Sequence, residues 1–299
     1  MACPTCQRRS ALVAALAPAI SRRSFTREGL LAMLALPNER LLRVTKVQNR
    51  RGFLRRLELP LPTESVPTAL CRHDPDYPAM LAQLPSAPAV LYATCTIERL
   101  RELLTAPTVT IVGSRTHTDY AHQISSALAR DLATAGVTIV SGMNTGLEGN
   151  LHRVAVEVGG HTIAVMPGGS DVPFPRLHRY EDLHTAIRAH GAAVSELPPG
   201  FLVSSSWPFI ASQRIIAALA SVIVVMEAGG RSCALFTAQI AADLGADVAV
   251  VPGRLTDTGG KWMYGLLRDG AQPIACAQDV VNLIYGAGAR ELAARELAA

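Results

Sequence analysis

The chain from Thr108 to Tyr285 alternates short apolar segments with amphipathic helical stretches, and this alternation constrains the fold more than any other feature. Six segments are rich in β-branched residues and apolar on both sides: Val109–Val112, Val137–Val140, Thr162–Val165, Ala193–Ser195, Val222–Val225 and Val248–Val251. Strands of this kind lie in a parallel sheet covered by helices on both faces. The sequence therefore predicts an α/β domain with a doubly wound, mostly parallel sheet.

The remainder of the chain divides into shorter regions. Residues 1–60 are predicted to form a small helical N-terminal region, residues 61–107 a Pro-rich lead-in segment, residues 108–285 the α/β domain and residues 286–299 a short C-terminal tail. No run of 18 uncharged apolar residues occurs, so no membrane span is expected. Six scattered cysteines in a chain of this size fit reduced thiols and a cytoplasmic protein.

Charge is distributed unevenly between the two parts of the chain. Residues 1–110 hold 15 Lys and Arg against 8 Asp and Glu, whereas residues 111–299 hold 13 basic and 16 acidic residues. A basic N-terminal part suggests a polyanionic partner. Because the larger part is net acidic, any phosphate site there must depend on backbone N–H groups and a few arginines.

The N-terminal pair Cys3 and Cys6 has the spacing of half a zinc site. No second Cys pair or His pair at ligand spacing follows it in the sequence. The pattern therefore predicts no metal site and favours a frayed chain end.

Four loops that follow predicted strands carry glycine, and most of them run into a helix. They comprise Gly113-Ser114-Arg115, the segment from Ser141-Gly142 to Gly146, Gly168-Gly169-Ser170-Asp171, and Gly229-Gly230-Arg231-Ser232. Glycine lets a backbone approach an anion closely, and helix N-termini present N–H groups with a favourable dipole. Carboxyl ends of parallel strands meet at one sheet edge, so these loops predict an anion site there.

Known nucleotide and catalytic motifs are missing from these loops. The sequence has neither the Gly-x-Gly-x-x-Gly of dinucleotide-binding domains nor the Gly-x-x-x-x-Gly-Lys-Ser/Thr of P-loops. His152, His178 and Glu196 are conceivable as an acid/base set, but capping or packing roles are favoured for each. We therefore expect no catalytic residues and no cofactor.

Taken in order, the loops resemble the DNA-processing protein A family (DprA, also called Smf). The matching stretches are Ile111-Val112-Gly113-Ser114-Arg115; Ser141-Gly142 with Gly146 and His152; Asp171-Val172 with Pro175; Ser195-Glu196 with Pro199-Gly200; Arg214-Ile215-Ile216; Glu227-Ala228 with Arg231-Ser232; and Val251-Pro252-Gly253. With the lead-in around Tyr77-Pro78 and Leu91-Tyr92, the resemblance covers about residues 75–285.

This resemblance implies an extended Rossmann-like fold that binds single-stranded DNA, forms a homodimer and loads the RecA recombinase in natural transformation and DNA uptake. It implies no cofactor, no metal and no turnover. The residues implied to contact DNA are Gly113, Ser114, Arg115, Ser141, Gly142, Gly146, Gly168, Gly169, Arg214, Arg231 and Ser232. Single-strand binders also stack bases on aromatic rings, for which Trp207, Phe209 and Phe174 are the candidates.

Three departures from the family pattern bear on DNA affinity. Thr145 stands where the family has a basic residue, Ser212-Gln213 stands where it has Arg-Asn, and Cys233-Ala234 follows Arg231-Ser232 in place of Gly-Ser. Each lost positive charge at a phosphate weakens binding and lowers its salt dependence.

Two other functions stay open on the sequence. Pro167-Gly168-Gly169 is faintly similar to the Pro-Gly-Gly motif of phosphoribohydrolases, which makes a nucleotide-binding enzyme or sensor the alternative. A role in protein docking alone would use the apolar stretch Val280 to Tyr285 as a dimer or partner surface. The favoured interpretation of this stretch is a helix that covers the domain.

Overall fold

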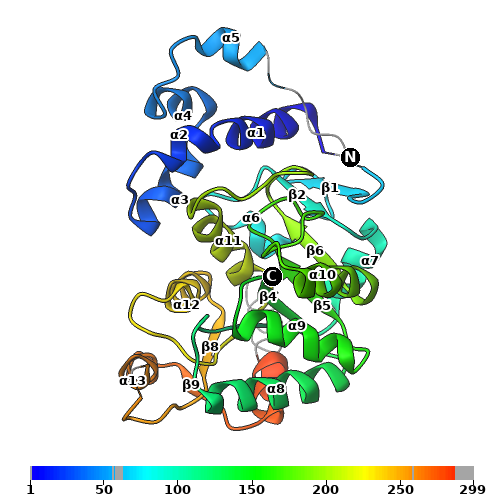
Figure 1. The fold of residues 1–299 in the computed structure, drawn as a ribbon, viewed down its shortest axis with the longest axis vertical. Helices are drawn as coiled ribbons and strands as arrows, with labels where there is room; N and C mark the ends of the chain where they lie inside the picture. Colours follow the sequence, from blue (N-terminus) through cyan, green and yellow to red (C-terminus); the bar gives the residue numbers. More distant parts are fainter. Residues whose placement is uncertain (1, 56, 58–62, 258, 287–299) are drawn as a thin grey trace, which may run out of the picture.

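The computed structural model describes the whole chain except residues 1, 56, 58–62, 258 and 287–299. Its centre is a nine-stranded sheet of order β1-β2-β6-β5-β4-β3-β7-β8-β9 (Figure 1). The strands from β6 to β9 in this order are parallel, and they comprise β6 (Ala192–Ser195), β5 (Thr162–Val165), β4 (Thr138–Gly142), β3 (Thr108–Val112), β7 (Val222–Val225), β8 (Asp247–Val250) and β9 (Gln272–Pro273). The predicted α/β fold with a mostly parallel sheet is confirmed.

Helices cover both faces of this sheet. One face packs on α8 (Asp119–Thr134), α9 (Leu147–Glu157) and α10 (His178–His190), together with a helix over residues 277–286. The other face packs on α6 (Ala79–Ala82), α7 (Ile97–Thr105), α11 (Trp207–Ala218), α12 (Cys233–Asp243) and α13 (Gly260–Arg268). Because both faces are covered, β3 and β7 are buried along their whole length, and β7 consists of apolar residues alone.

Strand alternation explains how the two faces form separate cores. Val109 and Ile111 of β3 pack with the α8 and α9 helices, whereas Val112 belongs to the core on the α11 side. Val280 and Ile284 complete the core on the α8 side, so the helix over residues 277–286 covers the sheet as expected. Tyr285, on the same helix, is 65% exposed.

The lead-in segment adds two strands that the sequence analysis did not predict. β2 (Val90–Ala93) pairs antiparallel with β6, and β1 (Thr68–Cys71) pairs antiparallel with β2. Both strands are buried along their length. The segment is therefore an extension of the sheet beyond β6 as well as a Pro-rich connection.

The described residues of the N-terminal region form five helices: α1 (Pro4–Ala15), α2 (Ala17–Ser21), α3 (Arg27–Ala35), α4 (Asn38–Val44) and α5 (Arg50–Arg55). Figure 1 shows them at one end of the molecule, beside β1, β2 and α11. Their apolar side chains share a core with Leu197, Trp207 and Ala211 of the α/β domain. Thr26 begins α3 because its side chain accepts a hydrogen bond from the Gly29 N–H at 3.0 Å.

Two features of the predicted organisation fall largely on residues without a description. The boundary between residues 60 and 61 lies in the gap at residues 58–62, and the tail expected at residues 286–299 lies outside the described residues except for Gly286. Within the described part of the chain, no helix has the length and apolar character needed to cross a bilayer.

Candidate nucleic-acid interface

The order of the sheet reverses between β3 and β7. The chain adds β4, β5 and β6 on one side of β3, and then β7 and β8 on its other side. Connections that leave neighbouring strands in opposite directions open a crevice at the carboxyl edge, where open α/β folds bind their ligands. The loops after β3 and β7 meet there, because the Ser114 N–H donates to the Glu227 carbonyl at 2.9 Å.

The side chain of Glu227 fixes the first of these loops. One of its carboxylate oxygens accepts from the Thr118 hydroxyl at 2.6 Å and from the Thr118 N–H at 3.2 Å, just before α8 begins. The Ser114 hydroxyl donates to the Glu227 carbonyl at 3.1 Å. The turn through Gly113 and Ser114 is thereby held in place, and Arg115, the next residue, is exposed.

The loop after β4 packs directly on the loop after β3. Gly146 has φ +95, a conformation that favours glycine, and a side chain there would collide with the Arg115 backbone. The following Leu147 N–H faces the Ser114 carbonyl at 3.4 Å. These contacts bring the N-terminus of α9 beside Arg115, so glycine at 146 is required by both backbone conformation and close approach.

Ser141 and Gly142 lie below this surface. The fully buried Ser141 hydroxyl donates to the Ile111 carbonyl at 2.6 Å, which ties β4 to β3. Gly142 lies against the Glu148 carboxyl group, which would clash with any side chain at position 142. Both residues therefore shape the site from within, and the Ser141 hydroxyl is already used by the protein.

Glu148, in the first turn of α9, is an acidic residue buried beneath these loops, where the sequence predicts an anion site. The residue is 5% exposed, and its carboxyl group accepts a hydrogen bond from the Asn144 amide at 2.7 Å. Burial raises its pKa from 4.5 to about 7, although the bonds to Asn144 and the positive charge of Arg115 act in the opposite direction. A protonated Glu148 removes one negative charge from the site, which favours an anion.

Three arginines surround the same edge. Arg115 and Arg231 are exposed, and within the described residues neither forms an ion pair. Arg27, at the start of α3, reaches this loop from the N-terminal region: its guanidinium donates to the Arg231 carbonyl at 2.6 Å and to the Ser232 carbonyl at 2.9 Å. Sequence reasoning missed Arg27, since no motif marks it.

Ser232 stands at the N-terminus of α12. Its side chain accepts a hydrogen bond from the Ala234 N–H at 3.1 Å and so caps the helix. The edge therefore combines the N-termini of α9 and α12 with the three arginines.

The loop after β5 lies two strands from β3. Gly168 and Gly169 are buried against the segment 198–203, the Gly168 carbonyl accepts from the Ser195 hydroxyl at 2.5 Å, and the Gly169 N–H donates to Phe201 at 2.9 Å. The buried hydroxyl of Ser170 has no hydrogen-bond partner among the described residues. The structure thus places this loop at the same edge of the sheet, one strand beyond the loop after β4.

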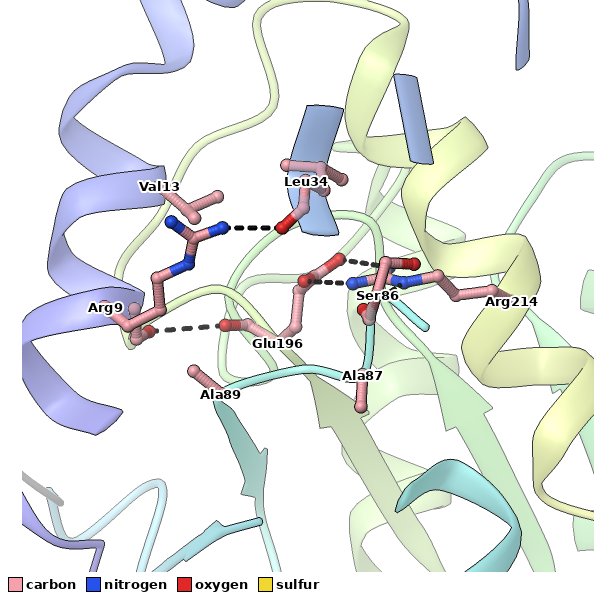
Figure 2. Close-up of a pocket in the computed structure, with 9 residues that line it drawn as sticks. Arg9, Val13, Leu34, Ser86, Ala87, Ala89, Glu196 and Arg214 are labelled. Atoms are coloured by element: carbon pink, nitrogen blue, oxygen red, sulfur yellow. Dashed lines mark hydrogen bonds and ion pairs between the residues drawn. The ribbon is translucent and has the colours of Figure 1, made fainter. Parts of the chain in front are cut away.

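Arg214 lies inside the protein, away from the loops to which it was assigned. Figure 2 shows its guanidinium facing Glu196, with nitrogen–oxygen distances of 2.7 Å to both carboxylate oxygens. Its Nε donates to the Ser86 carbonyl at 2.9 Å, and the side chain is 1% exposed. The expectation that Arg214 contacts phosphate is therefore corrected: all of its groups are engaged internally, and it holds α11 to the lead-in segment and the chain after β6.

Comparison with known proteins identifies the family. Residues 68–285 match the family model of the DNA recombination-mediator protein A. The chain belongs to this family. The matched segment starts at β1 and ends in the helix that covers β3 and β7, so it contains every loop described above.

Curated family members and solved structures extend the comparison. A putative DNA processing protein DprA from Mycobacterium tuberculosis is 39% identical over 186 residues, which are 62% of this chain and 46% of the relative. The DprA of Bacillus subtilis is 32% identical over 206 residues, covering 68% and 67% of the two chains. The chain thus spans about half the length of its Mycobacterium tuberculosis relative.

Two solved structures share the fold. DprA from Streptococcus pneumoniae superposes with a TM-score of 0.66 at 24% identity and covers 91% of this chain and 92% of its own. DNA processing protein A from Helicobacter pylori, described for its single-stranded DNA binding mode, superposes with a TM-score of 0.59 at 28% identity, over 70% of this chain and 93% of its own.

The departures of this family member from the expected pattern are of two kinds. Ser212 and Gln213 are buried in α11, where both side chains donate to the Phe209 carbonyl at 3.0 Å. The Gln213 carbonyl oxygen also accepts from the Thr237 hydroxyl at 2.6 Å. These two positions serve internal packing, so among the missing basic residues only Thr145, which is partly exposed beside Gly146, lies at the candidate interface.

The aromatic residues are distributed differently from the sequence-based expectation. Trp207 is 4% exposed and belongs to the core shared with the N-terminal helices, and Phe174 and Phe209 pack edge to face with centroids 5.0 Å apart. Trp262, which the sequence reasoning passed over, is 39% exposed. Its ring packs on Gly230, directly before Arg231, and the Lys261 ammonium lies 5.1 Å from the ring centroid.

The conceivable acid/base residues each have partners of their own. His152 is fully buried between the Thr162 hydroxyl at 2.6 Å and the Gly142 carbonyl at 3.0 Å, and burial lowers its pKa to about 4. His178 is exposed and lies 3.4 Å from Asp182, while Glu196 is paired with Arg214. The contacts of His152 and Glu196 agree with the packing roles that the sequence favoured, whereas His178 is exposed at the start of α10, whose N-terminus has no side-chain cap among the described residues.

Proposed function

We propose that this protein binds single-stranded DNA without turnover, by holding consecutive phosphates at the carboxyl edge of its sheet. The observation that carries the proposal is the convergence of Arg115, Arg231 and Arg27 on the N-termini of α9 and α12. Helix N-termini and arginine forks are the groups that recognise phosphate. Family membership and the single-strand binding described for the Helicobacter pylori protein support the same ligand.

Trp262 supplies a stacking surface in this proposal. The Trp262 indole is 39% exposed beside the Arg231 loop, and stacking of a base on an aromatic ring is independent of base identity. Lys261 and Arg231 beside the ring add the positive charge that a backbone next to a stacked base requires.

Fluorescence anisotropy with a labelled oligothymidine strand tests the proposal. We expect binding at low salt that weakens in Arg115→Ala. The matched control is Arg130→Ala, an exposed arginine near the C-terminal end of α8, whose N-terminal end lies at the carboxyl edge. Absence of binding at low salt, or equal loss of affinity in both variants, contradicts the proposed interface.

We further propose that the bound strand is delivered to the RecA recombinase during DNA uptake and natural transformation, by a cytoplasmic homodimer. These functions rest on the family resemblance and need their own measurements. Light scattering at two protein concentrations tests dimerisation, and the rate of RecA filament formation on a coated strand tests loading. The alternative, a nucleotide-binding enzyme of the phosphoribohydrolase type, requires release of a free base from nucleoside monophosphates.

A further inference from the structure

Four potential metal ligands meet where α1 begins and β1 ends. Cys3 lies directly before α1 and Cys6 lies in its first turn; Cys71 is the last residue of β1, and His73 follows two residues later. The three sulfur atoms and one ring nitrogen all lie within 4.8 Å of one another. No other group of three or more His, Cys, Asp or Glu side chains among the described residues has this arrangement.

The distances agree with tetrahedral coordination of a single ion. Bond lengths of about 2.3 Å to sulfur and about 2.0–2.1 Å to nitrogen put sulfur and nitrogen ligands about 3.6 Å apart, and two sulfur ligands about 3.8 Å apart. The Cys3 and Cys6 sulfur atoms lie 3.5 Å and 3.4 Å from the same atom, His73 Nδ1. A thiol–imidazole hydrogen bond needs one sulfur atom at the ring nitrogen, whereas here two sulfur atoms lie close to the same nitrogen.

We propose that Cys3, Cys6, Cys71 and His73 bind one Zn²⁺ ion. Thiolate and imidazole ligands suit zinc, and four protein ligands without an open position indicate a structural site. This metal site lies outside the proposed DNA interface and does not depend on it.

The surroundings of the cluster favour bound metal over isolated thiols. The Cys3 N–H lies 3.5 Å from the Cys71 sulfur, where it stabilises a thiolate ligand. Cys6 and Cys71 are buried among apolar side chains that keep water away from the thiolates. Arg9 and Arg72 line the adjoining groove with Cys6 and His73, and their charge offsets the net negative charge of three thiolates on one Zn²⁺.

The site would join two parts of the chain that are distant in sequence. Cys3 and Cys71 are 68 residues apart, and Cys71 and His73 lie in the segment that matches the family while Cys3 and Cys6 precede it. An ion that closes such a long loop restricts the unfolded chain and fixes α1 against β1. Zinc therefore acts here as the anchor of the N-terminal helices on the sheet.

The test is the metal content of the 299-residue chain, purified under reducing conditions with any affinity tag removed. We expect one zinc per chain by inductively coupled plasma mass spectrometry. Replacement by Co²⁺ should give the intense visible absorption of a tetrahedral ion and a thiolate-to-cobalt charge-transfer band. The proposal would be overturned by little or no zinc, by iron in its place, or by a protein mass lower by two hydrogen atoms, which indicates a disulfide.

One ligand variant and two control variants separate ligand loss from misfolding. His73 is exposed, so His73→Ala should leave the fold intact but lower zinc retention against a competing chelator at least about tenfold, as even outer partners of a metal site do. The controls His178→Ala and Cys276→Ser, both at exposed positions outside the cluster, should retain zinc fully. Equal retention in His73→Ala and the controls would contradict the site.

Discussion

The core around Arg214 and the carboxyl edge of the sheet use the same residue types in opposite ways. In the core, the Arg214 guanidinium is paired with Glu196 through both of its terminal nitrogens. At the edge, Arg115 and Arg231 are exposed, and among the described residues the buried Glu148 has the Asn144 amide as its only hydrogen-bonding side chain. Matched charge stabilises a fold, whereas unmatched charge of this kind is available to a ligand.

The largest effect should come from breaking the matched pair. Arg214→Met leaves Glu196 uncompensated in a largely buried position, and loss of one partner of a buried ion pair costs about 3–5 kcal/mol. We expect the free energy of unfolding in urea to fall by this amount, with unchanged oligonucleotide affinity per folded molecule. A marginal loss of stability, or a specific loss of DNA affinity, would return Arg214 to the binding surface.

Glu148 tests the other side of the comparison through pH. Its pKa is about 7 in the folded chain against 4.5 when exposed, so below pH 4.5 the group is protonated in both states and contributes no difference. As pH rises from 4.5 to about 7, the unfolded chain loses this proton first and the folded state becomes relatively less stable. Above that range, the ionised Glu148 lowers the free energy of unfolding by about 3 kcal/mol.

Glu148→Gln removes this ionisation while keeping the shape of the side chain. The variant should gain stability over the parent protein between about pH 5 and about pH 8, as measured by urea unfolding at both values. A difference that does not change with pH would mean that Glu148 stays ionised in the folded protein.

A smaller effect is expected for the stacking surface. Trp262→Ala should weaken binding of an oligothymidine strand by about 1–3 kcal/mol, because a base loses its aromatic partner. Tyr285→Ala, which removes another exposed ring, serves as the control. If both substitutions have the same effect, Trp262 is not at the interface.

The sequence predicts the parallel sheet well because burial on both faces leaves a strong local pattern. β5 and β7 lie where expected, at Thr162–Val165 and Val222–Val225. β1 and β2 escape prediction since prolines lie close to both, and their strand conformation depends on the pairing of β1 with β2 and of β2 with β6. A strand with a strong local sequence pattern is easier to predict than a strand that depends on tertiary pairing.

The candidate site could be predicted only in part, for a related reason. The glycine-rich loops follow from strand order, but Arg115 and Arg214 look alike in sequence, and only the fold shows which of them is buried. Arg27 and Trp262 reach the edge through tertiary packing, without a local motif. Cys71 and His73 likewise form a mixed pair far from Cys3, which a search for matching pairs does not detect.

The most direct test of the central claim is the salt dependence of single-stranded DNA binding in the parent protein and in Arg115→Ala/Arg231→Ala. Each phosphate contact contributes about 0.7 to the slope of log affinity against log salt concentration for a single strand. We predict that the double variant binds more weakly and loses about 1.4 from the slope, while Arg130→Ala keeps the parental value. A slope unchanged in the double variant would show that the phosphates are bound elsewhere.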